Sequence, residues 1–63
     1  MNFQEAVLNA LRGSNIRLPY WTRDNYVFAD SCGALYYHDE NANYDWPYFL
    51  TEEPVLATDW EIF

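Results

Sequence analysis

The chain has 63 residues, a formal net charge of −7, and an aromatic set of four Phe, six Tyr and three Trp. A domain of this size buries only about 60% of the surface that its unfolded chain exposes, and a single cysteine, Cys32, excludes an intramolecular disulfide framework. Aromatic packing and self-association are therefore the expected sources of stability. Neither a membrane-spanning run nor a secretory signal is recognisable, so we expect one soluble, cytoplasmic domain covering residues 1–63.

Charge is distributed unevenly along the chain. Residues 1–23 contain all three arginines and one acid, whereas residues 24–63 contain nine acids and no Lys or Arg. The acidic balance argues against direct binding to a nucleic-acid backbone, which needs a basic surface. Four interpretations stay open: a solvated surface, a basic binding cleft, an acidic imitation of nucleic acid, and pairing of the two halves in an oligomer.

The N-terminal segment carries a helix signal with both ends marked. Asn2 and Glu5 have the spacing of a capping box, and Gly13 is a residue that readily ends a helix. Apolar residues between them recur with helical period and predict one packed stripe. The positions expected to be buried in the whole chain are Phe3, Val7, Ala10, Leu11, Val27, Leu35, Trp60 and Ile62.

Short β-like runs separated by turn residues follow the glycine. The first is 16–18, which Pro19 ends or confines to a sheet edge, and the runs 26–29 and 34–38 predict an antiparallel hairpin. A polar loop over 39–43 precedes an extended aromatic run over 44–50.

The end of the chain predicts a short helical turn and a final strand. Thr51 is placed to cap a turn that continues through Ala57, and residues 59–63 alternate polar and apolar as in a strand. The fold class is therefore α+β: an N-terminal helix, then a small antiparallel β-sheet with a short helical turn before the last strand.

Motifs for catalysis or metal binding are weak. His38 is the single histidine, no nucleophile motif surrounds it or Cys32, and we expect no enzyme activity and no cofactor. The D-x-N-x-N-x-D run over 39–45 resembles the opening of a calcium loop, but Tyr44 and Leu50 stand where that loop needs Gly and Glu. We therefore interpret it as a polar loop and expect no metal.

The aromatic residues exceed what one short helix can cover. Trp21 follows Pro19 at the expected strand exit and lies two residues before Arg23. A Trp beside an Arg is suited to stacking on a nucleobase while the planar guanidinium pairs with phosphate. Core packing is the competing interpretation for each ring.

Both ends of the chain resemble the type 2 Thoeris anti-defence proteins of phages. The opening FQEAVLNALRG over 3–13, followed by Ile16 and Trp21, is similar to the family's helix, glycine, strand and tryptophan. Trp46, Thr51 and the segment VLATDWE over 55–61 are similar to its closing pattern, although Pro54 replaces an acid and the middle is shorter.

This resemblance implies a function. Members of the family bind cyclic-nucleotide immune signals at protomer interfaces, as homotetramers, without cleaving them. For this chain it implies a cyclic-nucleotide ligand, a homo-oligomer (dimer or tetramer), and ligand contacts at Trp21 and Trp46. Arg23 is added from its chemistry alone.

A second hypothesis belongs to a different class. The acids of residues 24–63 are suited to an inhibitor that places carboxylates where a host defence nuclease expects phosphates, with Asp39, Glu40 and Asp45 as the test residues. A third hypothesis is a small structural protein in which every aromatic residue is core.

Overall fold

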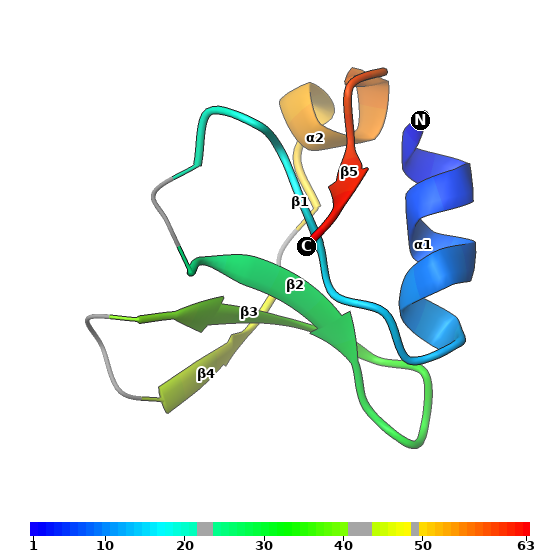
Figure 1. Cartoon of the computed structure of the whole chain (residues 1–63). Helices are drawn as coiled ribbons and strands as arrows, with labels where there is room; N and C mark the ends of the chain where they lie inside the picture. Colours follow the sequence, from blue (N-terminus) through cyan, green and yellow to red (C-terminus); the bar gives the residue numbers. More distant parts are fainter. Residues whose placement is uncertain (22–23, 41–43, 49) are drawn as a thin grey trace.

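A computed structural model describes residues 1–21, 24–40, 44–48 and 50–63, and within these ranges two helices and five strands occur (Figure 1). The sheet is antiparallel, and the arrangement confirms the predicted α+β class. In chain order the elements are α1 (Phe3–Leu11), β1 (Ile16–Arg17), β2 (Tyr26–Ala29), β3 (Leu35–Asp39), β4 (Tyr44–Pro47), α2 (Glu52–Leu56) and β5 (Glu61–Ile62).

Helix α1 begins and ends at the predicted signals. The Asn2 side chain accepts a hydrogen bond from the backbone N–H of Glu5 at 2.8 Å, and the Asn2 N–H donates to the Glu5 carboxylate at 3.1 Å. This reciprocal pair satisfies two of the N–H groups that a helix start leaves open. After the helix, Gly13 adopts a φ of 101°, a conformation that side chains disfavour.

The sheet order is β4-β3-β2-β1-β5. The predicted hairpin is confirmed, because β2 and β3 pair from Tyr26 opposite His38 to Ala29 opposite Leu35. Its turn is closed by the Asp30 carboxylate, which accepts backbone hydrogen bonds from Cys32 and Ala34, both at 2.9 Å.

Strand β1 lies inside the sheet, between β2 and β5. The prediction that Pro19 ends this strand is confirmed, and the alternative of an edge strand is wrong. Proline is compatible with this central position because the ladder has ended at Arg17, two residues earlier.

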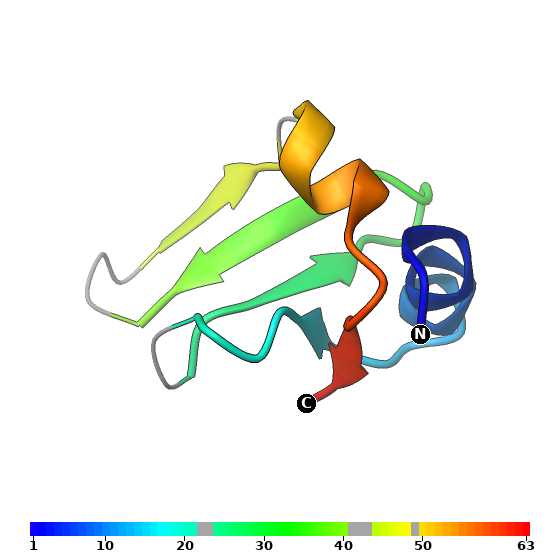
Figure 2. The same cartoon turned by 90° about the horizontal axis from the view of Figure 1, so that it is seen from above.

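The core lies between the sheet and α1, and α2 packs against α1 (Figures 1 and 2). Trp60, just before β5, is 2% exposed and its indole N–H donates to the Pro54 carbonyl of α2 at 2.9 Å. Its backbone N–H donates to the Met1 carbonyl at 3.0 Å, so this residue joins α2 to the start of the chain. The fully buried apolar residues are Ala6, Ala10, Ile16, Leu18, Val27 and Trp60.

Two predicted core residues are wrong: Leu11 is 51% exposed and Ile62 is 53% exposed. The face of α1 that meets the sheet carries the small residues Ala6 and Ala10, and Leu11 lies at the flank of that contact, over the turn that contains Gly33. Ile62 lies on the edge strand β5. Leu11→Ala should therefore cost clearly less than the about 2–5 kcal/mol of a buried leucine.

The other predicted core residues divide into two groups. Ala10, Val27 and Trp60 are buried, which confirms them. Phe3 and Leu35 are partly buried and pack against the core, and Val7 is partly buried as well. Thr51 occupies the predicted cap position of α2, but its side chain makes no capping hydrogen bond.

Neither described helix has the length and apolar character that crossing a membrane requires.

Candidate functional site

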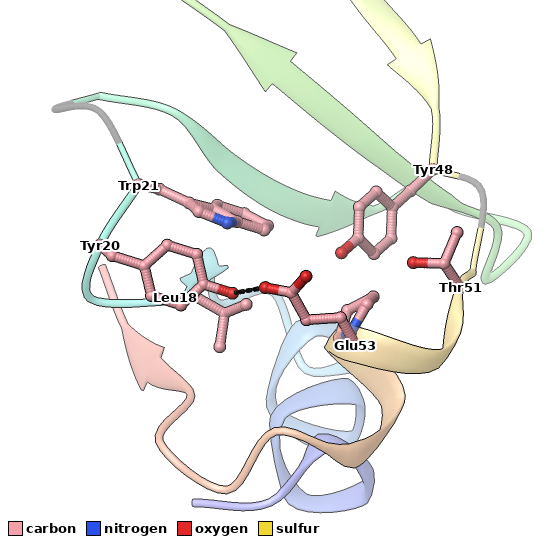
Figure 3. A pocket seen from close by; sticks show the side chains of 7 residues that line it. Leu18, Tyr20, Trp21, Tyr48, Thr51 and Glu53 are labelled. Carbon is pink, nitrogen blue, oxygen red and sulfur yellow. Dashed lines mark hydrogen bonds between the residues drawn. The ribbon is translucent and has the colours of Figure 1, made fainter.

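A cavity of about 210 Å³ opens between the segment after β1 and the start of α2 (Figure 3). Its walls combine three aromatic rings with a carboxylate and a hydroxyl. The lining residues are Leu18, Tyr20, Trp21, Tyr48, Thr51, Glu53 and Pro54.

Trp21 is positioned by a tight turn and by three aromatic neighbours. Its backbone N–H donates to the Leu18 carbonyl at 3.1 Å, which closes the turn through Pro19. Its ring centroid lies 5.3 Å from that of Tyr37, 5.4 Å from Trp60 and 6.2 Å from Tyr48, each in an edge-to-face arrangement. The ring is therefore partly buried and fixed in place, with part of it bordering the cavity.

Tyr20 and Glu53 form the polar side of the cavity. The Tyr20 hydroxyl donates to Glu53 Oε1 at 2.6 Å, and Figure 3 shows the two side chains pointing toward each other. This hydrogen bond, with burial and the negative charges of Glu53 and Asp59, raises the pKa of Tyr20 to about 12. The phenol is thus held as a neutral donor to a carboxylate.

Tyr48 follows β4 and forms another aromatic wall. Its ring lies 6.2 Å from Tyr37 in a stacked arrangement, and its backbone N–H donates to the Leu35 carbonyl at 3.0 Å. Burial raises the pKa of Tyr48 to about 12, reinforced by the negative charges that Tyr20 and Tyr37 carry once they ionise in alkali and by the charge of Glu53.

These two phenols predict a loss of stability in alkali. A folded-state pKa of about 12, above the ordinary 10.0, stabilises the fold fully below pH 10, and the contribution is lost as the pH rises toward 12. Denaturant unfolding should show the free energy falling across this window, and Tyr48→Phe should flatten the fall. A fall that is identical in Tyr48→Phe and wild type would contradict the assignment.

The three residues proposed from sequence have different outcomes. Trp21 lines the cavity. Trp46 does not belong to the lining; it lies on β4 opposite Tyr37, is 44% exposed, and packs its ring 4.6 Å from that of Tyr44. Arg23 lies outside the described residues. Tyr37 stands between the two tryptophans, so both belong to the same side of the sheet.

Sequence reasoning missed most of the cavity wall. Tyr20 and Tyr48 belong to the aromatic surplus and Glu53 lies in the first turn of α2, but no sequence pattern singles out any of the three. They lie up to 33 residues apart along the chain, and only the tertiary fold brings them together. No spacing in the sequence predicts that the Tyr20 hydroxyl and the Glu53 carboxylate meet at this cavity.

The minor candidates add little to this site. Asn41 and Asn43 of the calcium-like run lie outside the described residues, and the described ranges contain no group of three His, Cys, Asp or Glu side chains suited to a metal ion. His38 bonds to Asp45 through Nδ1 at 2.8 Å, and Cys32 is exposed.

Comparison of the chain with protein-family models, with curated proteins and with solved structures gives no match.

Proposed function

We propose that this chain binds a cyclic nucleotide, with its base in the Trp21 cavity, and sequesters the ligand without cleaving it. The observation that carries the proposal is the placement of Trp21, whose ring borders the cavity and is held there by three other aromatic rings. Flat aromatic surfaces stack on any nucleobase, and a ring that is already fixed loses little freedom on binding.

The cavity size limits what enters it. Its volume of about 210 Å³ is below the about 300–1,000 Å³ of pockets that hold drug-sized ligands, so it suits a single base. The ribose and phosphate then lie at the open mouth. We assign the phosphate to Arg23 on sequence grounds, and Trp46 to a more distant contact on the same side of the sheet.

Glu53 supplies a polar contact for the base. A carboxylate has about four lone-pair positions, so the hydrogen bond from Tyr20 leaves acceptor capacity for an amino group on the base edge. The same carboxylate would repel a phosphate, which favours the orientation with the base inside and the phosphate outside.

The resemblance to phage anti-defence proteins supports the choice of a cyclic ligand and of a homo-oligomer.

A thermal-stability screen tests this function. Cyclic dinucleotides and cyclic ADP-ribose isomers are added to the protein, with the matching linear nucleotides as controls. At least one cyclic ligand should raise the melting temperature, and chromatography should recover it intact after long incubation. A flat response to the whole set, or conversion of the ligand, would refute the proposal.

A specific observation favours a second function, that of an acidic inhibitor. Asp24 precedes β2, Asp39 and Glu40 lie at the end of β3, and Asp45 lies on β4, so all four acids gather at one end of the sheet. The Asn25 side chain accepts from the Glu40 N–H at 3.0 Å and ties this end together. Such a surface suits the basic nucleic-acid groove of a host defence nuclease.

This alternative predicts that charge at the acidic end is essential. Asp39→Asn, Glu40→Gln and Asp45→Asn together should abolish inhibition in a panel of defence nucleases, and wild-type binding should weaken steeply with salt. The control is Glu5→Gln, Glu52→Gln and Asp59→Asn, which removes the same charge elsewhere. Equal inhibition by both triple variants, or binding that ignores salt, argues against mimicry.

A further inference from the structure

The side of the sheet that faces away from α1 and α2, which we call the outer face, is rich in aromatic residues. Val27 points into the core, and because side chains alternate along a strand its neighbours Tyr26 and Phe28 point to the other side. Their partners on β3 are His38 and Tyr36. The outer face comprises Arg17, Tyr26, Phe28, Tyr36, His38 and Phe63.

The rings of the outer face contact one another across the sheet. Ring centroids lie 5.6 Å apart for Tyr26 and Phe63, 4.8 Å for Tyr26 and His38, and 5.9 Å for Phe28 and Tyr36. None of these residues is fully buried, and Phe63 is 47% exposed. Helix α1 packs on the opposite side of the sheet and α2 packs against α1, so among the described residues no helix covers these rings.

The outer face differs from the rest of the chain in charge. Arg17 Nε lies 3.3 Å from Glu61 Oε1, its guanidinium carbon lies 5.1 Å from the Phe63 ring centroid, and His38 pairs with Asp45. Glu61 and Asp45, which the strand register places opposite Arg17 and His38, therefore each have a partner on this face. The chain as a whole has a net charge of −7.

We propose that the outer face is a contact surface between two copies of this chain. A second copy is itself strongly acidic, so it is least repelled here, where Arg17 contributes a positive charge and Glu61 is paired with it. A sheet covered by helices on one side is expected to bury its other apolar side as well. Two such faces packed about 10 Å apart would place the sheets in the centre and the helices outside.

Small size strengthens the case for a second copy as the occupant. Among the described residues the hydrophobic core cluster contains six buried side chains, of which two are alanines. A contact between like faces is isologous, so both subunits of a dimer bury the same set of aromatic residues. The inference rests on the homo-oligomer of the proposed function and names the face through which two copies meet, whereas the Trp21 cavity lies on the helix side of the sheet.

Sedimentation analysis of three variants tests the contact. The wild type should have at least twice the monomer mass of 7.5 kDa at micromolar concentration. Phe28→Glu places two like charges in the centre of the contact and should reduce the mass to that of the monomer. Leu56→Glu, at a residue 66% exposed on α2, adds the same charge elsewhere and should keep the wild-type mass.

Phe63→Glu is a second outer-face variant, in case Phe28→Glu does not fold. The Phe63 side chain is already half exposed, so a charge there should disturb the fold less. Circular dichroism establishes which variants fold, and a folded Phe63→Glu should also lose the oligomer. A monomeric wild type overturns the proposal, as does dissociation by Leu56→Glu alone or full assembly of both folded outer-face variants. Ligand binding by the Trp21 cavity has no part in this readout, so the thermal screen for the ligand and the sedimentation test of the contact can fail separately.

Discussion

Trp60→Ala should destabilise the protein by about 3–5 kcal/mol, the usual cost of removing a large buried aromatic side chain. Trp60 is 2% exposed, and its ring centroid lies 5.6 Å from that of Phe3 and 5.4 Å from that of Trp21. Its loss opens the contact between α1, α2 and the sheet. A domain of this length has a total stability of only about 3–9 kcal/mol, so the variant should be largely unfolded at 25 °C.

Urea unfolding of matched variants measures this effect. Trp46→Ala makes the same substitution at a ring that is 44% exposed, and it should cost far less. Trp60→Phe keeps an aromatic ring but leaves the Pro54 carbonyl unpaired, so an intermediate loss of about 1–3 kcal/mol is expected. If Trp60→Ala remained within about 1 kcal/mol of wild type, the core described above would be wrong.

Trp21→Ala should reduce both stability and ligand affinity. The residue is partly buried against Tyr37, Tyr48 and Trp60, so its removal weakens the core as well as the cavity wall. One base-aromatic stack contributes about 1–3 kcal/mol, which is a loss of about 5-fold to 150-fold in affinity. Trp21→Phe retains a stacking surface and should lose less stability and less ligand affinity than Trp21→Ala.

Calorimetric titration separates the two effects of this substitution. Binding is measured with the cyclic ligand found in the screen, at a temperature where the melting curve shows each variant to be folded. Trp46→Ala is the matched control and should retain more of the affinity. A destabilised Trp21→Ala whose folded fraction binds as tightly as wild type would remove Trp21 from the site.

Local signals made α1 and the β2–β3 hairpin predictable from sequence. The Asn2 and Glu5 pair and Gly13 act within a few residues, and Asp30 closes its turn over four. The order of the strands depends on pairing over long separations, such as Ile16 opposite Ile62, and no local pattern reports it. For the same reason the central position of β1 was not predicted.

Hydrophobic periodicity predicted which side of an element each residue faces. It did not predict how much of that side the neighbouring elements cover. Helical spacing placed Leu11 on the apolar stripe, yet the sheet meets α1 through Ala6 and Ala10. Strand alternation placed Ile62 on the same side as Trp60, yet Ile62 is 53% exposed and Trp60 is 2% exposed. The residue pattern indicates the direction of a side chain, whereas the neighbouring elements determine whether that side chain is covered.

The candidate site was predicted through one residue. Trp21 was selected for its position after Pro19 and near Arg23, and it lines the cavity. Tyr20, Tyr48 and Glu53 join it only because the segment after β1 meets the start of α2. The surplus of aromatic residues was apparent from composition, but its division between the cavity and the outer face required the fold.

The most direct test of the proposed function is a nuclear magnetic resonance titration with the cyclic ligand selected by the thermal screen. The three tryptophans give three indole N–H signals, which Trp→Phe variants assign. The Trp21 signal and the backbone signals of Tyr20 and Glu53 should move together and saturate with the ligand, while those of Phe28 and Tyr36 on the outer face stay in place. Saturable shifts that leave Trp21, Tyr20 and Glu53 unmoved, or no shifts at all, would contradict a ligand site in this cavity.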